Sequence, residues 1–128
     1  MFNERQRLYL TIILFHFIFH PGVPGRPSIT LTTADVQATS LTVKWTAPAD
    51  DGGSLITAYR VVITQGSTEK INENVTDPNT KELYIGNLNK DTNYAVNVYA
   101  RNYVFEGDAS QKIMKTKYEG EYPCKTPT

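Results

Sequence analysis

Apolar and polar residues alternate along several short stretches of this chain, with the two-residue period of strands that bury one face. In residues 40–46, for example, Leu41, Val43 and Trp45 are apolar and their neighbours are polar. The same alternation, interrupted by turn residues, predicts strands at residues 28–33, 40–46, 56–64, 69–72, 82–86, 92–102 and 110–117. No stretch predicts a helix, and no internal repeat is visible. We therefore expect an all-β fold.

The inward positions of these strands predict a core with four large side chains. Trp45 and Tyr59 share the parity of aliphatic neighbours on their own strands. Leu88 and Tyr94 have a Leu-x-x-x-Thr-x-Tyr spacing, which suggests a corner where the tyrosine hydroxyl bonds back to the preceding turn. Each buried large side chain contributes about 1.5–3 kcal/mol, so more than a dozen of them offset the ordering entropy of one domain.

A set of short motifs accompanies this pattern between residues 23 and 117. The motifs are Pro24-Gly25-Arg26-Pro27, Trp45, the loop 48–56 with Asp50-Asp51-Gly52-Gly53, Tyr59-Arg60-Val61, the corner from Leu88 to Tyr94, and Ala100-Arg101-Asn102 before Gly107. Together they resemble the fibronectin type III family. The resemblance implies a seven-stranded antiparallel β-sandwich of immunoglobulin-like fold, without catalytic residues or a cofactor. It also implies that the chain belongs to an extracellular adhesion molecule, receptor or matrix protein, or to a giant muscle protein inside cells.

The composition is that of one globular domain with tails. The chain has 128 residues, of which 40% are hydrophobic and 20% are charged. Its 13 basic and 13 acidic residues give a formal net charge of zero, which favours neither nucleic acid nor an anionic membrane surface. The single cysteine, Cys124, cannot form an internal disulfide, whereas an immunoglobulin domain needs two cysteines.

The two ends of the chain differ from the sandwich. Residues 1–20 form an apolar leader with a basic head, interpreted as a signal peptide, an uncleaved anchor, or an incorrectly joined start of a longer protein. Its apolar run, 8–19, is shorter than the roughly 20 residues of a spanning helix. Residues 21–27 contain three prolines and two glycines and predict a stiff, extended linker. Residues 118–128 are interpreted as a polar tail.

Catalytic constellations are missing from the predicted sandwich. Both histidines, His16 and His20, precede it, so a Ser-His-Asp site has no histidine within the fold. Cys124 has no histidine neighbour and is interpreted as an ordinary tail thiol. Asp50-Asp51 are adjacent, so their carboxylates point apart, and the glycines that follow favour a turn over a cation site. We expect no enzyme, metal, cofactor or small-molecule substrate.

Asn74-Val75-Thr76 is a sequon for N-glycosylation. The predicted strands leave it in a loop, where a glycan has room. We therefore expect a glycan on Asn74 if the protein follows the secretory route.

A candidate protein contact lies on the outward face of residues 56–64, 92–102 and 110–117. In the last of these stretches we expect Ile113 to face the core and Met114 to face outward, so that an exposed apolar stripe forms. The candidate contact residues are Val62, Tyr99, Arg101, Tyr103, Phe105 and Met114. The alternative is an innocuous surface, because scattered exposed apolar residues are common in proteins.

These features indicate a non-catalytic protein-binding or spacer module of a modular cell-surface or secreted protein, acting in cell adhesion or recognition. The identity of the protein partner does not follow from the sequence, and a membrane would be reached only through residues 1–20 or through a missing part of the parent protein. One alternative is an intracellular, cytoplasmic structural module of a muscle-type filament protein, where loops similar to Asp50-Asp51-Gly52-Gly53-Ser54 are common. Another is an accessory domain of an enzyme.

Overall fold

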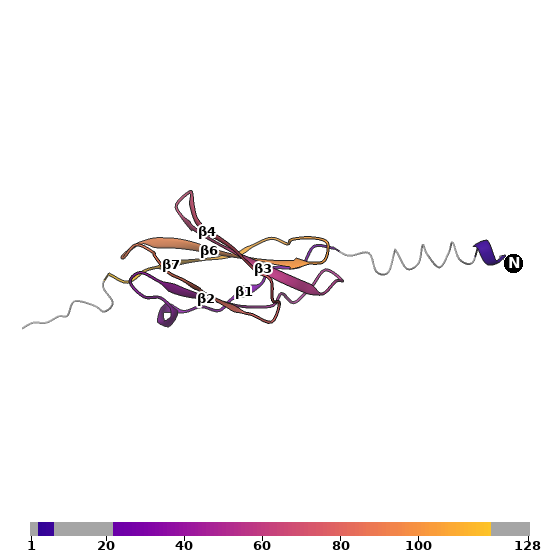
Figure 1. Ribbon diagram of the computed structural model, residues 1–128, viewed down its shortest axis with the longest axis horizontal. Coiled ribbons are helices and arrows are strands. Elements are labelled where there is room, and N and C mark those ends of the chain that lie inside the picture. Colours follow the sequence, from indigo (N-terminus) through magenta and orange to yellow (C-terminus); the bar gives the residue numbers. More distant parts are fainter. Residues whose placement is uncertain (1–2, 7–21, 119–128) are drawn as a thin grey trace, which may run out of the picture.

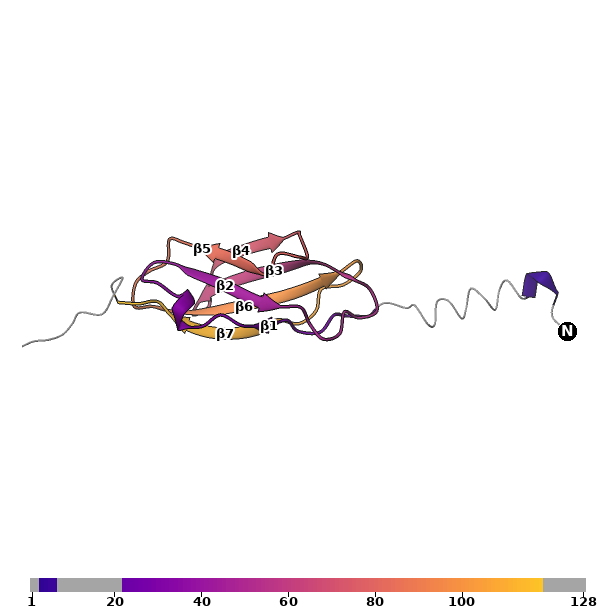
Figure 2. The ribbon, with the colours of Figure 1, turned by 90° about the horizontal axis from the view of Figure 1, so that it is seen from below.

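The computed structural model describes residues 3–6 and 22–118 of the chain. Within 22–118, seven strands form two antiparallel sheets that lie face to face in two layers (Figure 1). The three-stranded sheet, seen in Figure 2, has the order β1-β2-β5, with β1 at Ser28–Ile29, β2 at Leu41–Thr46 and β5 at Glu82–Ile85. The four-stranded sheet has the order β4-β3-β6-β7, with β3 at Ile56–Gln65, β4 at Thr68–Val75, β6 at Asn93–Asn102 and β7 at Ser110–Lys115. The predicted seven-stranded antiparallel β-sandwich is confirmed.

The core lies between the two sheets. Trp45 of β2 and Tyr59 of β3 meet there, with ring centroids 5.4 Å apart. Leu88 and Tyr94 are also buried, so all four predicted core side chains lie inside. The aliphatic residues packed around them include Leu31, Val36, Leu41, Val43, Val61, Ile63, Ile85, Val96 and Val98.

A tyrosine corner closes the turn between β5 and β6. The backbone N–H of Asn89 donates a hydrogen bond to the Tyr94 hydroxyl oxygen at 2.8 Å, as the spacing predicts. Asn87 and Asp91 flank this turn with φ angles of 57° and 51°, a left-handed conformation that asparagine and aspartate adopt more readily than most residues. The corner therefore fixes where β6 begins.

β7 faces the opposite way from the sequence prediction. Met114 is 8% exposed and packs in the core, whereas Ile113 is 64% exposed. The reason is the register with β6, which pairs Met114 with the inward-facing Tyr94 and Ile113 with Ala95. Paired residues of an antiparallel ladder point to the same face, so the partner strand decides between two adjacent apolar residues.

β1 ends earlier than predicted, and short helical turns occur where no helix was expected. The chain leaves the sheet after Ile29 and forms a 3₁₀ turn at Thr33–Asp35. Asp35 stabilises this turn by accepting a hydrogen bond from the Thr32 N–H at 2.7 Å, while Lys44 Nζ donates to the same carboxylate at 2.6 Å. At the other described segment, residues 4–6 form a helical turn.

The described part of the predicted linker is docked on the sandwich. We call residues 22–27 the lead-in segment. Its Gly22 N–H donates to the Gly52 carbonyl oxygen at 2.6 Å, and its Gly25 N–H donates to the Asp50 carbonyl oxygen at 2.8 Å. Pro24 is also buried. Long-range backbone hydrogen bonds therefore hold residues 22–27 of the stretch expected as a linker against the sandwich. Residues 7–21 and 119–128 lie outside the described part of the chain.

Candidate functional site

The predicted apolar stripe on the four-stranded sheet is not formed. Met114 lies in the core, as described above, and Val62 is only 6% exposed although it points outward. Polar neighbours cover Val62: Asn97 of β6 donates from Nδ2 to the Val62 carbonyl oxygen at 3.3 Å, and Gln111 of β7 donates to Asn97 Oδ1 at 2.8 Å. This part of the outward face is thus covered by polar side chains, while Ile113 of β7 is an exposed apolar residue on the same face.

A charged cluster of Arg60, Arg101 and Glu106 lies on this face near the end of β6, where the β6–β7 loop (residues 103–109) begins. Arg60 makes two hydrogen bonds to Glu106, from Nε to Oε2 at 2.9 Å and from Nη2 to Oε1 at 2.7 Å. Arg101 Nε lies 3.1 Å from the same Oε2. The Arg60 guanidinium also lies over the Tyr99 ring, 4.1 Å from its centroid. The cluster therefore ties the β6–β7 loop to β3 and half-covers Tyr99.

The electrostatics of this cluster follow from its geometry. The two hydrogen bonds from Arg60 hold the pKa of the Glu106 carboxyl below its ordinary value. Glu106 in turn raises the pKa of Arg60. Both groups are therefore charged at neutral pH, and the loop is held in place by a two-point, charge-assisted contact.

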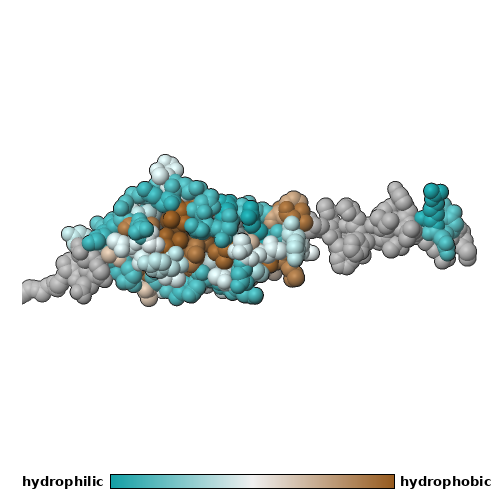
Figure 3. Space-filling view, viewed as in Figure 1, coloured by the Kyte–Doolittle hydropathy of each residue, from teal (hydrophilic) through white to brown (hydrophobic). Residues whose placement is uncertain are grey.

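The β6–β7 loop exposes three large apolar side chains next to the charged cluster. Tyr103 is 79% exposed, Val104 is exposed, and Phe105 is 42% exposed. We call these three residues the loop surface. A hollow of ≈ 290 Å³ lies beside it and is lined in part by Thr57 and Ala58 of β3. Figure 3 shows apolar side chains gathered at this end of the domain, from which residue 22 leads away.

Asn102 holds the base of this loop from inside. It is buried, and its Oδ1 accepts hydrogen bonds from the N–H groups of Val104 at 2.9 Å and Phe105 at 2.8 Å. Its Nδ2 donates to the carbonyl oxygens of Gly22 at 2.8 Å and Asp51 at 3.0 Å. One side chain thus connects the β6–β7 loop, the β2–β3 loop (residues 47–55) and the lead-in segment. The sequence analysis did not single out this role, because the bonds to Gly22 and Asp51 depend on the fold, although the bonds to Val104 and Phe105 are local.

The candidate contact residues are therefore only partly brought together. Tyr103 and Phe105 lie on the loop surface, and Arg101 lies beside it with a partly exposed side chain. Tyr99 is half-buried beneath Arg60. Val62 and Met114 do not contribute, since both are buried.

Asn74 lies inside a strand and not in the predicted loop. β4 extends to Val75, where we expected a strand that ends at residue 72. Asn74 pairs with Arg60 of β3 and is exposed, and its Oδ1 accepts from Arg101 Nη1 at 3.5 Å. β4 is an edge strand, so the Asn74 side chain remains accessible on the outward face.

The described residues also bear on whether the chain has a metal site or a membrane-spanning helix. Residues 3–6 and 22–118 contain no group of three side chains suited to hold a metal ion. In the same ranges, no helix has the length and apolar character that crossing a bilayer requires. Asp50 and Asp51 each accept a hydrogen bond from the N–H two residues later, at 2.8 Å, as expected of a turn. His16, His20 and Cys124 lie outside the described residues.

Comparison with known proteins gives a consistent result. The family model named "Fibronectin type III domain" matches residues 25–116. The chain is 28% identical over 108 residues to fibronectin type-III domain-containing protein 3a of Gallus gallus, which covers 84% of this chain and 9% of the relative. It is 33% identical over 82 residues to endoglucanase B of Cellulomonas fimi, which covers 64% of this chain and 7% of that enzyme. The chain thus spans less than a tenth of the length of either relative.

Solved structures with the same architecture include an extracellular region and a part of titin. Domains d3-d4 of the rat CD45 extracellular region superpose with a TM-score of 0.65 at 21% identity, over 75% of this chain and 51% of that one. A titin structure with domains A168-A170 superposes with a TM-score of 0.60 at 27% identity, over 76% of this chain and 33% of that one. The architecture alone therefore does not decide the compartment.

Proposed function

Because the chain belongs to the fibronectin type III family, whose domains commonly bind proteins or space other modules, we propose that it is a non-catalytic recognition module of a modular cell-surface or secreted protein, acting in cell adhesion or recognition. The observation that carries this proposal is the loop surface. Tyr103, Val104 and Phe105 are exposed side by side, on a loop fixed at its base by Asn102 and by Glu106.

A fixed aromatic loop suits protein binding. Aromatic side chains bury a large area and lose few degrees of freedom, and they are enriched where interfaces are most sensitive to mutation. The two-point Arg60–Glu106 contact holds the loop before a partner arrives, so that less conformational entropy is lost on binding. Arg101 adds a partly exposed cation at the rim.

The sequon bears on both the surface and the cellular route. A glycan on Asn74 would cover the outward face of the four-stranded sheet near Arg60 and Arg101. The loop surface follows the end of β6, so the glycan would border it on the side of Arg101. The sequon at Asn74 and the apolar run 8–19 both support the proposal of a secretory route.

A second candidate function is that of an intracellular structural module of a filament protein. The observation in its favour is the 27% identity to the titin domains. The match to part of endoglucanase B likewise keeps an accessory role beside a catalytic domain as a third reading. Both alternatives predict that the loop surface has no partner on a cell.

The experiment that tests the proposal is adhesion of beads that carry the full chain to a panel of intact animal cells. The double variant Tyr103→Ser/Phe105→Ser removes the aromatic rings of the loop surface, and Ile113→Ser removes an exposed apolar residue on the sheet face as a matched control. We expect the double variant to reduce adhesion about tenfold or more, as for central interface aromatics, and the control to leave it unchanged. Adhesion that the double variant does not reduce, or no adhesion above blank beads to any cell, contradicts the proposal.

A further inference from the structure

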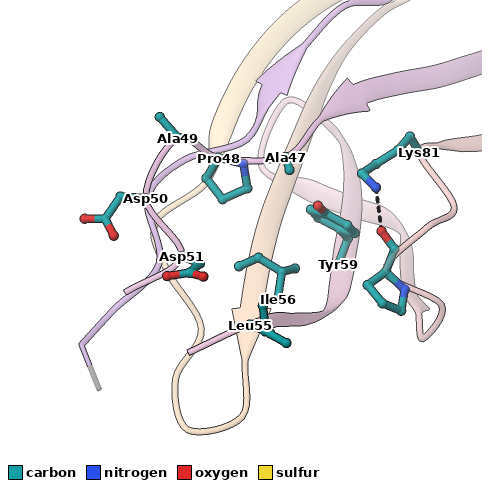
Figure 4. Close-up of a pocket in the computed structure, with 10 residues that line it drawn as sticks. Ala47, Pro48, Ala49, Asp50, Asp51, Leu55, Ile56, Tyr59 and Lys81 are labelled. Atoms are coloured by element: carbon teal, nitrogen blue, oxygen red, sulfur yellow. Dashed lines mark hydrogen bonds between the residues drawn. The ribbon is translucent and has the colours of Figure 1, made fainter. Parts of the chain in front are cut away.

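A second hollow lies between the β2–β3 loop and the start of β5, separate from the loop surface. Its volume is ≈ 480 Å³, which is within the range of pockets that hold small molecules or single side chains. Its walls, drawn in Figure 4, combine apolar and charged groups. The lining includes Pro48, Asp51, Leu55, Ile56, Tyr59 and Lys81.

Tyr59 places a phenol group in this hollow. The residue is 1% exposed, yet no residue in the described part of the chain is hydrogen-bonded to its hydroxyl. Figure 4 shows the hydroxyl end of the ring pointing toward Pro48 and Ala47, away from Lys81. Burial raises the pKa of Tyr59, so the phenol is neutral at physiological pH and can both donate and accept a hydrogen bond. The hydroxyl oxygen itself is accessible from the hollow, so a ligand or water can complete its hydrogen bonding.

Asp51 supplies a negative charge at the rim. Its Oδ1 accepts a hydrogen bond from the Gly53 N–H at 2.8 Å, which fixes the carboxylate and leaves Oδ2 free. Figure 4 shows this carboxylate on the side of Leu55 and Ile56, whereas the Asp50 carboxylate points away from the hollow. No cation of the described residues pairs with Asp51.

The remaining walls define what fits between these two groups. Pro48, Leu55 and Ile56 offer apolar contact, and Lys81 forms the far wall. The Lys81 ammonium is already engaged, since its Nζ donates to the Pro78 carbonyl oxygen at 2.5 Å and lies 5.6 Å from the Tyr59 ring centroid. The hollow therefore accepts an apolar stem and one cation on the Asp51 side.

We propose that this hollow binds an arginine side chain presented by an extended peptide of a partner protein. The arginine stem packs between Pro48 and Ile56, the guanidinium donates to Asp51 Oδ2, and a further N–H donates to the Tyr59 hydroxyl oxygen. Arginine fits better than lysine, because its planar group is more weakly hydrated and has donors in several directions for two separate acceptors. The site is independent of the loop surface, and it gives the module a second, charge-selective contact.

The test is a titration of the ¹⁵N-labelled full chain with the peptide acetyl-Pro-Arg-Pro-amide, followed by nuclear magnetic resonance. The same peptide with citrulline in place of arginine has nearly the same shape without the charge, and acetyl-Pro-Lys-Pro-amide keeps the charge in another form. We expect saturable shifts of the Asp51, Gly53 and Tyr59 amides with the arginine peptide, and at least about fivefold weaker binding of the other two.

Three variants locate the contact. Asp51→Asn keeps the Oδ1 acceptor of the turn but loses the charge, and Tyr59→Phe loses only the hydroxyl; each should weaken binding about fivefold. Asp50→Asn is the matched control, with the same chemical change on a carboxylate that points away, and should change binding less than about twofold. Equal binding of the citrulline or lysine peptide, equal effects of Asp50→Asn and Asp51→Asn, or no saturable shift overturns the proposal.

The outcome is separable from that of the adhesion experiment. Tyr103→Ser/Phe105→Ser should bind the arginine peptide like the wild type, because neither residue lines the hollow. If cell adhesion depends on the loop surface but the peptide does not bind, only the arginine site is wrong. If the peptide binds at Asp51 and Tyr59 but adhesion does not depend on the loop surface, only the loop proposal is wrong.

Discussion

Two polar side chains at opposite ends of β6 each fix the loop next to them. Tyr94 near its start accepts the hydrogen bond from Asn89, and Asn102 at its end bonds to three separate segments. Both residues are buried, so a lost partner leaves a polar group without water to replace it. Single atoms at these two positions therefore matter more than most of the exposed charges.

Tyr94→Phe tests the corner. The substitution keeps the ring and removes only the hydroxyl that accepts from the Asn89 N–H. We expect the free energy of unfolding to fall by about 1–2 kcal/mol, because a part-buried donor is left unsatisfied. Urea denaturation measures the change, with the exposed Tyr84→Phe on β5 as the matched control that should have no effect. Equal values for the two variants would mean that the corner hydrogen bond does not stabilise the fold.

The charged cluster around Glu106 predicts that the free energy of unfolding depends on pH. Arg60 lowers the folded-state pKa of Glu106, so the stabilisation is complete above the unfolded pKa of about 4.3 and is lost as the pH falls through the folded value. Glu106→Gln should thus destabilise the protein by about 1–3 kcal/mol at pH 7, and this difference should shrink below about pH 4.3. Unfolding curves at pH 7 and pH 3 measure it, with the exposed Glu73→Gln as control. A difference that does not shrink at low pH argues against the ion pair as its cause.

At the scale of elements, the register of β7 is a finding that a pair of variants can check. Met114 faces the core opposite Tyr94, and Ile113 faces solvent. Met114→Ala should therefore cost about 2–4 kcal/mol, whereas Ile113→Ala should stay within about 0.5 kcal/mol. Thermal and denaturant unfolding of both variants measure these changes in the free energy of unfolding. A larger loss of stability for Ile113→Ala than for Met114→Ala would mean that Ile113 faces the core, as the sequence predicted.

The lead-in segment can be tested through the glycines that make room for it. A Cβ atom at Gly107 would collide with the Pro24 carbonyl oxygen, whereas one at Gly86 would meet only the Tyr84 side chain, 3.3 Å away, which is exposed and can move. Gly107→Ala should release the segment, so that the Gly22 and Gly25 amides exchange their hydrogens faster, while Gly86→Ala should leave them protected. If the Gly22 and Gly25 amides stay protected in Gly107→Ala, the lead-in segment does not pack against Gly107 as described.

Sequence patterns predicted the elements well wherever one strand carries its own signal. The alternation around Trp45 identifies its strand and inward face, because the apolar residues of that strand each lie between polar residues. Tyr59 and Tyr94 share the parity of the large aliphatic residues that follow them on their strands. In β7 the adjacent Ile113 and Met114 carry no such signal. Only the pairing with β6 determines which of the two faces the core.

The parts of the site that the sequence did not predict depend on contacts distant in the chain. The composition of the lead-in segment is typical of a linker, and its docking depends on Asn102 and on Gly52. Val62 has the expected parity, yet the side chains of neighbouring strands cover it. The arginine site likewise joins Asp51 with Tyr59, which lie on different elements, and the sequence treated each only as a turn or core residue.

At the scale of the whole molecule, the domain is elongated, and its two described ends lie far apart. Residue 22 leaves from one end and residue 118 from the other (Figure 1). The loop surface lies at the same end as residue 22, where the lead-in segment is docked. Residue 22 therefore lies near the loop surface, and residue 118 lies at the far end of the domain.

The measurement that tests the central claim, a recognition module outside the cell, is the intact mass of the full chain expressed in animal cells with a C-terminal tag. Protein from medium, membranes and cytosol is compared before and after removal of glycans. We predict protein in the medium that starts at or shortly before Gly22, because the lead-in segment is part of the fold, and that carries a glycan on Asn74. Full-length protein in membranes with that glycan would keep the module outside the cell on an uncleaved anchor. Unmodified full-length protein in the cytosol would contradict the claim and favour the intracellular structural module.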